Sequence, residues 1–299
     1  MIRVQAPCRL PICGGGHDLP EQWRKRPGFL VTAAINKYTT VTVGPGERID
    51  IGRDFGYPLA AGWKATDYVR FESQVLPGSG LGGSSALMVA LLRAKHPDLQ
   101  AHELAMAAYH LERFFLGEPV GYQDGFAAAF GGCLAMEIDT HGRVNTWPVT
   151  LPPDFNDRLL LMATGIQRPA ADVLNKQAEA ICTKLVSREA MDQIARLGHN
   201  IYEDLRDNGG RNYGPLTDLH WQFKRATTGA VTNPAIDTWY DLARENGASG
   251  GKCTGAGGGG FLLFVVEPPD RQHLVETMTA AGLVETPFQF TNEGARIIQ

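Results

Sequence analysis

Val75-Leu-Pro-Gly-Ser-Gly-Leu-Gly-Gly-Ser-Ser-Ala-Leu-Met-Val-Ala-Leu-Leu92 is the stretch that decides how this chain folds. Just before it, apolar and polar side chains alternate from Val69 to Val75, which predicts a half-buried β-strand. Residues 87–92 are apolar throughout, which is typical of a buried helix. Between the two, glycines remove side chains at the helix start, so that backbone N–H groups and the helix dipole can face an anion. Strand, glycine loop and helix together predict a phosphate-binding site.

Other interpretations of this loop need different residues. A tight turn capped by serine hydroxyls needs no ligand. The P-loop pattern G-x-x-x-x-G-K-[ST] fails, because no lysine follows the glycines. The pattern G-x-G-x-x-G does occur, at Gly78, Gly80 and Gly83, and a nicotinamide-dependent enzyme would then need an acidic residue after a second strand, about 20 positions on. Glu103 has that spacing but lies in residues 101–115, whose apolar pattern is helical, so this enzyme class stays open only as an alternative.

Three further glycine-rich stretches accompany the loop. In chain order, the four stretches are Arg9–Leu19, Pro77–Ala86, Gly121–Gly132 and Gly250–Phe261. They resemble, in the same order, the signatures of the GHMP kinases, which include galacto-, homoserine, mevalonate and phosphomevalonate kinases. Three other stretches resemble the D-glycero-D-manno-heptose 7-phosphate kinases of this family: Ala34–Tyr38, Thr164–Arg168 and Trp221–Arg225. The likeness covers nearly the whole chain, and four motifs in order are far more specific than one.

The resemblance implies an α+β protein with the two-lobed GHMP kinase fold. Residues 1–150 would form an N-terminal lobe, similar to domain 2 of ribosomal protein S5, that carries the ATP and catalytic motifs. Residues 151–299 would form a ferredoxin-like C-terminal lobe that closes the substrate cleft. The residues themselves place the seam at Pro148, Pro152 and Pro153, and the strand, helix, strand, strand pattern after residue 260 suits a ferredoxin-like half.

ATP and Mg²⁺ are the implied cofactors. The residues that would bind the nucleotide are Pro77, Gly78, Ser79, Gly80, Leu81, Gly82, Gly83, Ser84 and Ser85. Ser84 and Glu112 would hold the magnesium ion, which takes a few hard oxygen ligands from protein and the rest from phosphates and water. Without the resemblance, Glu112 would be read as a solvated residue near a helix end.

Asp124 and Arg9 match the catalytic positions of the family. Asp124 would accept or orient the proton of the attacking hydroxyl, and Arg9 beside it would keep this carboxylate ionised and stabilise the developing charge. The implied reaction is phosphorylation of the anomeric hydroxyl of a sugar or sugar phosphate, with D-glycero-D-manno-heptose 7-phosphate expected, for nucleotide-sugar synthesis. A GHMP kinase that acts on a different sugar or small alcohol is the alternative.

The implied substrate contacts come from both halves of the chain: Gly15, Gly16, His17, Asp18, Arg168 and Gly257. The Asp18 carboxylate suits a polyol, because it can accept two charge-assisted hydrogen bonds from hydroxyls, although a loop Asx-turn is the simpler role. His17 and Tyr122 depart from the Thr and Lys expected in heptose kinases, which makes them candidates for changed specificity. The basic run Arg24–Arg26 could contact a substrate phosphate or be solvated.

Composition argues against several other classes of protein. The 299 residues carry a net charge of −4, which gives no reason to expect nucleic acid or an anionic membrane as partner. No apolar run approaches the roughly 20 residues of a membrane span, and the N-terminus lacks the apolar core of a signal peptide. Five cysteines without a C-x-x-C pair fit a reducing compartment. We therefore expect a cytoplasmic enzyme with a small-molecule substrate, and a homodimer is left open.

Overall fold

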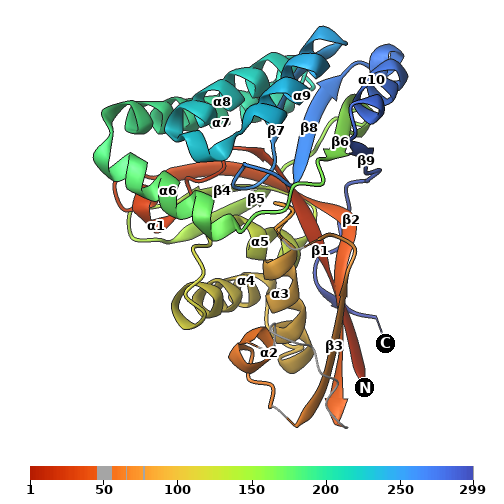
Figure 1. Ribbon diagram of the computed structural model, residues 1–299. Helices are drawn as coiled ribbons and strands as arrows, with labels where there is room; N and C mark the ends of the chain where they lie inside the picture. Colours follow the sequence, from red (N-terminus) through yellow and green to blue (C-terminus); the bar gives the residue numbers. More distant parts are fainter. Residues whose placement is uncertain (46–55, 65, 77, 299) are drawn as a thin grey trace.

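The chain folds around two β-sheets that follow one another in sequence (Figure 1). The structure is a computed structural model, which describes residues 1–45, 56–64, 66–76 and 78–298. Within these residues the first sheet has the strand order β10-β1-β2-β4-β5, with β3 paired to β2 outside this path. Its strands are β1 (Ile2–Cys13), β2 (Gly28–Pro45), β3 (Asp67–Ser73), β4 (Cys133–Ile138), β5 (Val144–Pro148) and β10 (Arg296–Ile297).

The long strand β2 organises this sheet. Its residues 28–33 pair with β4 and its residues 39–45 pair with β3, while β1 runs antiparallel to it along the other edge. Residues 6–13 of β1 are all buried, because α3 and α5 pack against this strand and α7 of the second lobe also contacts it. The loop that follows β1 therefore begins deep inside the protein, where the lobes meet.

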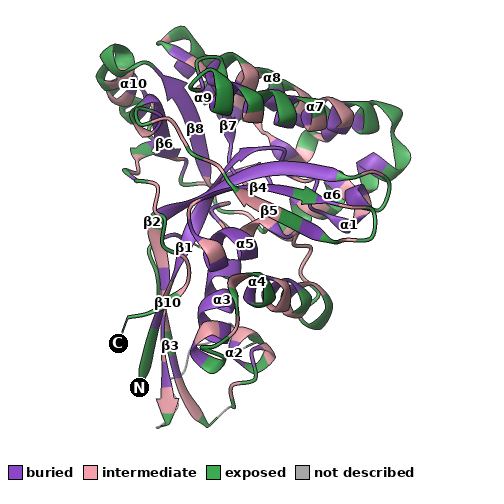
Figure 2. Ribbon diagram, turned by 180° about the vertical axis from the view of Figure 1, so that it is seen from behind, coloured by how far each residue is buried: buried purple, intermediate pink, exposed green. Residues whose placement is uncertain are grey.

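Helices cover one face of the first sheet, and Figure 2 shows how completely α3 is buried among them. The helices of this lobe are α1 (Pro20–Trp23), α2 (Gly56–Ala60), α3 (Gly83–Lys95), α4 (Ala101–His110), the π-helix η2 (Leu111–Phe115) and α5 (Gln123–Phe130). The predicted strand and buried helix are confirmed as β3 and α3, and the glycine loop between them is described at residues 74–76 and 78–82.

The second sheet is a four-stranded antiparallel sheet among the described residues, in the order β7-β8-β6-β9. Its strands are β6 (Leu159–Ala163), β7 (Ala248–Cys253), β8 (Phe261–Val266) and β9 (Val284–Glu285). Its helices are α6 (Ala170–Thr183), α7 (Leu185–Asp207), α8 (Tyr213–Thr227), α9 (Pro234–Glu245) and α10 (Pro268–Ala280), with 3-10 turns η3 (Asn156–Arg158) and η4 (Gly229–Val231). This strand order is that of a ferredoxin-like sheet, so the predicted α+β fold is confirmed.

The segment 289–298 leaves the second lobe and bonds to the first sheet. β10 pairs with Val4 and Gln5 of β1, and Phe290 bridges to Ile35 of β2. Backbone hydrogen bonds also join Thr291 to Ala34 and to the residue before β4. Figure 1 accordingly shows both ends of the trace close together beside β1. The division into lobes at residue 150 stays a proposal, in which we assign 289–298 to the N-terminal lobe.

Two predicted elements differ from the structure. The helix predicted for residues 101–115 changes at Leu111 into the π-helix η2, a widened turn that is often found at functional sites. The stretch 250–260, whose glycine content predicts a loop, begins as strand β7. The strand accepts glycines because α8 lies directly on it, and a Cβ at Gly250 would overlap the Gly214 carbonyl. The Gly- and Pro-rich composition of residues 44–66 predicts a loop or hairpin insertion, and this stretch contains α2; its residues 46–55 and 65 lie outside the described residues.

None of the helices in the described part of the chain has the length and apolarity to cross a bilayer.

Candidate active site

A cavity of about 710 Å³ separates the two halves of the chain. One side comes from β1, the loop after it, the glycine loop with the start of α3, and the start of α5. The other side comes from the segment after β6, from α8 and from β7. The predicted site residues that line it are Arg9, Gly15, Gly16, Asp18, Gly78, Ser79, Gly80, Gly82, Gly83, Ser84, Ser85, Asp124 and Arg168. Of the other predicted residues, Pro77 lies outside the described residues.

The glycine loop ends at the start of α3, where no side chain caps the backbone N–H groups of the first helical turn. Gly82 is the N-cap residue in a left-handed conformation (φ +76°), and no side chain accepts a hydrogen bond from the first turn. The free N–H groups and the helix dipole favour an anion at this point. Leu81 does not line the cavity. It is fully buried, and its carbonyl accepts a hydrogen bond from the Arg9 backbone N–H at 2.9 Å, which ties the loop to β1.

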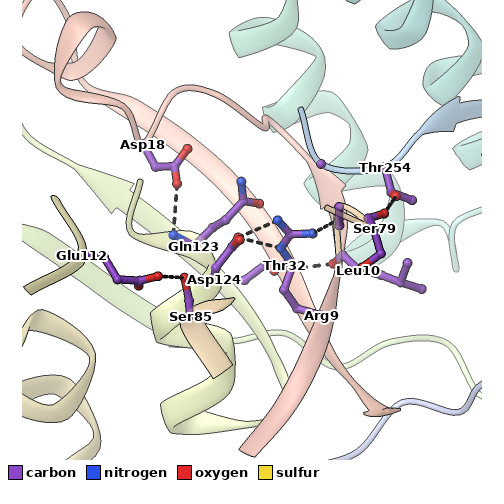
Figure 3. A network of polar contacts seen from close by, with 12 residues as sticks. Arg9, Leu10, Asp18, Thr32, Ser79, Ser85, Glu112, Gln123, Asp124 and Thr254 are labelled. Atoms are coloured by element: carbon purple, nitrogen blue, oxygen red, sulfur yellow. Dashed lines mark hydrogen bonds and ion pairs between the residues drawn. The ribbon is translucent and has the colours of Figure 1, made fainter. Parts of the chain in front are cut away.

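A second glycine loop, residues 254–260, packs closely on the first, mostly through backbone atoms. A Cβ at Gly255 would lie 2.6 Å from Gly80 Cα, and a Cβ at Gly260 would overlap the Ser79 carbonyl. The Thr254 hydroxyl donates to that same carbonyl at 3.4 Å (Figure 3). Because a Cβ at Gly255 or Gly260 would not fit between them, the two loops fix each other's position.

Arg9 and Asp124 form a two-pronged ion pair on the cavity floor (Figure 3). Arg9 Nε and one terminal nitrogen lie 2.7 Å and 2.6 Å from Asp124 Oδ1, and the other terminal nitrogen donates to the Gly80 carbonyl at 2.5 Å. Arg9 is only 3% exposed, whereas the Asp124 side chain retains 23% exposure toward the cavity. Asp124 sits in the first turn of α5, where the helix dipole also favours a carboxylate. This arrangement fixes the orientation of the Asp124 carboxylate beside the glycine loop.

Asp18 stands next to this pair. Its Oδ2 accepts a hydrogen bond from the backbone N–H of Gln123, the neighbour of Asp124, at 3.0 Å (Figure 3). A Cβ at Gly121 would overlap the Asp18 carboxylate, so only glycine permits this approach. Burial raises the pKa of the Asp18 carboxyl above its usual range. Hydroxyl groups of a ligand would offset that cost by donating to the carboxylate.

Glu112 is buried in the turn of η2, directly beside α3. Its Oε1 accepts hydrogen bonds from Ser85 Oγ at 3.1 Å and from the Tyr57 hydroxyl of α2 at 3.4 Å. Burial raises the pKa of this carboxyl to about 8, because few favourable contacts compensate for its lost hydration. The serine that contacts Glu112 is Ser85 and not the predicted Ser84. Ser84, 100° further around the start of α3, is exposed in the cavity wall.

Two family profiles match the chain. Residues 50–132 match "GHMP kinases N terminal domain" and residues 200–282 match "GHMP kinases C terminal", which together make up more than half of the chain. The chain belongs to the GHMP kinase family. This GHMP kinase is therefore an ATP-dependent enzyme, and the nicotinamide-dependent alternative is dropped.

Individual relatives agree with the family. The chain is 28% identical to the D-glycero-alpha-D-manno-heptose 7-phosphate kinase of Campylobacter jejuni, over 99% of this chain and 98% of that protein. It is 25% identical to the galactokinase of Thermococcus kodakarensis, over 89% of each chain. A solved D-glycero-D-manno-heptose 1-phosphate kinase from Bacteroides thetaiotaomicron has the same fold, with a TM-score of 0.80 at 23% identity over 100% of this chain and 99% of that one.

The magnesium ion of such a kinase fits the surroundings of Glu112. A buried carboxylate without a cation is unfavourable by itself, and Glu112 lies beside the Ser85 hydroxyl at the end of the predicted phosphate loop. The described residues contain no group of three or more His, Cys, Asp or Glu side chains that could hold a metal alone. Mg²⁺ needs no such cage, because phosphate and water complete its shell. We propose Glu112 with Ser85 as the protein ligands, in place of Glu112 with Ser84.

Glu112→Gln tests this assignment through stability. Between pH 4.5 and about 8 the unfolded chain ionises Glu112 while the folded protein keeps it neutral, so the wild type loses stability as pH rises across this window. Without magnesium and nucleotide, the variant should be more stable than wild type by ~1–3 kcal/mol at pH 8 and no more stable at pH 4.5. Thermal unfolding at both pH values measures this, with the exposed Glu189→Gln as control. The variant should also need more magnesium for turnover, and an unchanged requirement would remove Glu112 from the metal site.

Four candidate contact sites predicted from the sequence do not line the cavity: His17, Gly257, Tyr122 and the basic run 24–26. His17 is fully buried, with Nδ1 3.1 Å from the Gly14 carbonyl, and burial lowers its pKa to about 4. Gly257 packs against the backbone of Val231. Tyr122 packs against Tyr109 at a tilt and donates to a backbone carbonyl, which removes it as a direct specificity switch. The basic run 24–26 does not line the cavity either, and Arg26 pairs with an aspartate of α7.

Sequence reasoning missed two residues of this GHMP kinase that line the cavity, His220 and Lys252, and left open whether Lys224 faces the cavity or water; the structure places Lys224 in the cavity wall. His220 and Lys224 stand one turn apart on α8, and Lys252 lies in β7. A lysine inside a glycine-rich signature was a usable signal for Lys252, because such stretches rarely bury a charge without reason. For the pair on α8 the sequence did not reveal which face of the helix meets the cavity.

Proposed function

We propose that this GHMP kinase transfers the γ-phosphate of ATP to the anomeric hydroxyl of a sugar or sugar phosphate, with D-glycero-D-manno-heptose 7-phosphate as the expected acceptor. The observation that carries the proposal is the Arg9–Asp124 ion pair. Arg9 also donates to the Gly80 carbonyl of the glycine loop, and Gln123, the residue before Asp124, donates its backbone N–H to the Asp18 carboxylate. The heptose 7-phosphate kinase of Campylobacter jejuni, similar over nearly its full length, supports the choice of acceptor.

The proposed reaction follows from the positions of these groups. Backbone N–H groups at the start of α3 would bind the ATP phosphates, and Asp18 would hold sugar hydroxyls. Asp124 would accept the proton of the attacking hydroxyl as the bond to phosphorus forms, and Arg9 would stabilise the charge on the transferred group. Bound magnesium would neutralise phosphate charge beside Glu112. Positioning and electrostatics would supply most of the rate.

ADP release with a panel of free and phosphorylated sugars tests the acceptor. Turnover with ATP and magnesium should be fastest with D-glycero-D-manno-heptose 7-phosphate, and the product should carry phosphate on the anomeric oxygen. Turnover only with galactose, mevalonate or another unphosphorylated alcohol would retain the kinase and overturn the acceptor.

A further inference from the structure

The two sides of the cavity differ in charge. Its lining carboxylates, Asp18, Glu118 and Asp124, all come from the N-terminal half of the chain. The opposite wall, built by residues 167–256, contributes no carboxylate among the described residues. Its charged and titratable nitrogen groups are Arg168, His220, Lys224 and Lys252. We call Lys224, Lys252 and His220 the cationic wall.

The two lysines of the cationic wall are buried without a counter-charge. Lys224 is 6% exposed and donates from Nζ to the Gly255 carbonyl at 2.6 Å, and Lys252 is 3% exposed and donates to the Ile12 carbonyl at 2.6 Å. Neither ammonium forms an ion pair with a described residue. One carbonyl uses only one of three N–H donors, so both groups keep donors for a ligand. Burial lowers the pKa of Lys224 to about 8 and of Lys252 to about 7, a cost that a bound anion would relieve.

His220 provides the independent sign of a missing ligand. It is 2% exposed, lines the cavity, and neither of its ring nitrogens has a hydrogen-bond partner among the described residues. Buried polar nitrogens are normally paired, so an unpaired imidazole next to two ammonium groups indicates a ligand with acceptor atoms. A phosphate group supplies several acceptor oxygens and the negative charge that this wall lacks.

We propose that Lys224, Lys252 and His220 form a subsite for a phosphate group that the acceptor substrate already carries, remote from the hydroxyl that reacts. This subsite rests on the proposed function. ATP phosphates are the other source of the same chemistry, but their expected place is the start of α3. Lys252 instead lies against Ile12, the end of β1 just before the loop that carries Asp18. A sugar could then extend from Asp124 past Asp18 to the cationic wall.

Arg168 lies at the nucleotide side of this subsite. Its backbone carbonyl lies against Gly78, and its side chain follows Gly258 and Gly259 of the second glycine loop. All three guanidinium nitrogens lack partners among the described residues, so Arg168 has donors free for either phosphate group. We therefore leave Arg168 out of the test that separates the two sources.

Lys224→Met and Lys252→Met test the subsite, because methionine keeps the volume of each stem and removes the charge. For each variant, KM is measured for D-glycero-D-manno-heptose 7-phosphate, for the same heptose without phosphate, and for ATP. We expect KM for the phosphorylated acceptor to rise about 10–100-fold, because one charged hydrogen bond is lost. KM for the unphosphorylated heptose and KM for ATP should change less than about threefold. Lys176→Met, exposed on α6, is the matched control and should match wild type.

Other results would overturn the subsite. An equal rise in KM for both acceptors, or a rise confined to ATP, would assign these lysines to general packing or to the nucleotide. Thermal unfolding without ligand checks that the variants fold, and if Lys224→Met does not, Lys252→Met and His220→Phe carry the test.

A binding measurement separates this inference from the reaction. If no sugar is turned over, the proposed function fails, and the subsite is then tested without ATP. Heptose 7-phosphate should raise the unfolding temperature of the wild type and the Lys176→Met control but not of Lys224→Met or Lys252→Met. No rise in the wild type would overturn the subsite as well.

Discussion

Asp124→Asn should lower kcat by about 10²–10⁴-fold and leave the Kd for ATP within about threefold of wild type. Asparagine has the shape of aspartate and still offers Oδ1 to the Arg9 guanidinium, which lies 2.6–2.7 Å away in the wild type. It cannot take the proton of the attacking hydroxyl. The glycine loop, which Arg9 holds through the Gly80 carbonyl, should stay in place, so ATP should bind nearly unchanged.

Steady-state kinetics and nucleotide titration measure both effects. The control is Asp241→Asn, an exposed residue of α9 far from the cavity wall, which should behave as wild type. Full activity of Asp124→Asn would disprove its role as base. Loss of ATP binding together with activity would show that the ion pair mainly supports the loop. Some loss of stability is expected in either case, because the variant leaves the Arg9 charge buried without its partner.

Gly255→Ala should raise the Kd for ATP at least about tenfold and lower stability by ~2–4 kcal/mol. Gly255 has φ +60° and lies directly against Gly80 of the first glycine loop. A methyl group at Gly255 would lie 2.6 Å from Gly80 Cα and 2.8 Å from the Gly80 carbonyl oxygen. The neighbour is backbone and cannot rotate away. The two glycine loops must then separate, and the loop expected to bind phosphate loses its support.

Gly209→Ala isolates the steric part of this effect. Gly209 has a similar φ of +65°, but a Cβ there would meet nothing within 4 Å. It should lose only the ~1–2 kcal/mol of left-handed backbone strain and keep ATP affinity. Equal ATP affinities of the two variants, measured by titration calorimetry, would show that contact between the loops does not support nucleotide binding.

The sequence was most informative where a motif constrains the backbone. The glycines of residues 78–83 predict a loop before a buried helix, and the structure has both, since only glycine allows these turns and the close contacts of Gly80. Arg9, Asp18 and Asp124 line one cavity as expected. Asp18 lies just after the turn of Gly14 and Gly16, whereas Arg9 lies in β1 and Asp124 in the first turn of α5. Their chemical roles remain proposals.

Side-chain direction was less predictable. One residue along a helix changes the facing direction by 100°, so the sequence could not distinguish Ser85, which contacts Glu112, from Ser84. The π-helix that brings Glu112 against α3 has no recognisable signal in Leu111–Phe115. In the cationic wall, Lys224 of α8 and Lys252 of β7 are nearly 30 residues apart in the sequence. Only the packing of α8 on β7 brings these side chains to the same wall of the cavity.

The return of residues 289–298 to the first sheet constrains the order in which the protein can mature on the ribosome. β1 is synthesised almost 300 residues before its edge partner β10. Pairing over so long a separation is entropically costly and slow. The N-terminal lobe must therefore wait with an open strand edge while the ferredoxin-like lobe is synthesised. The segment 289–298 closes that edge last.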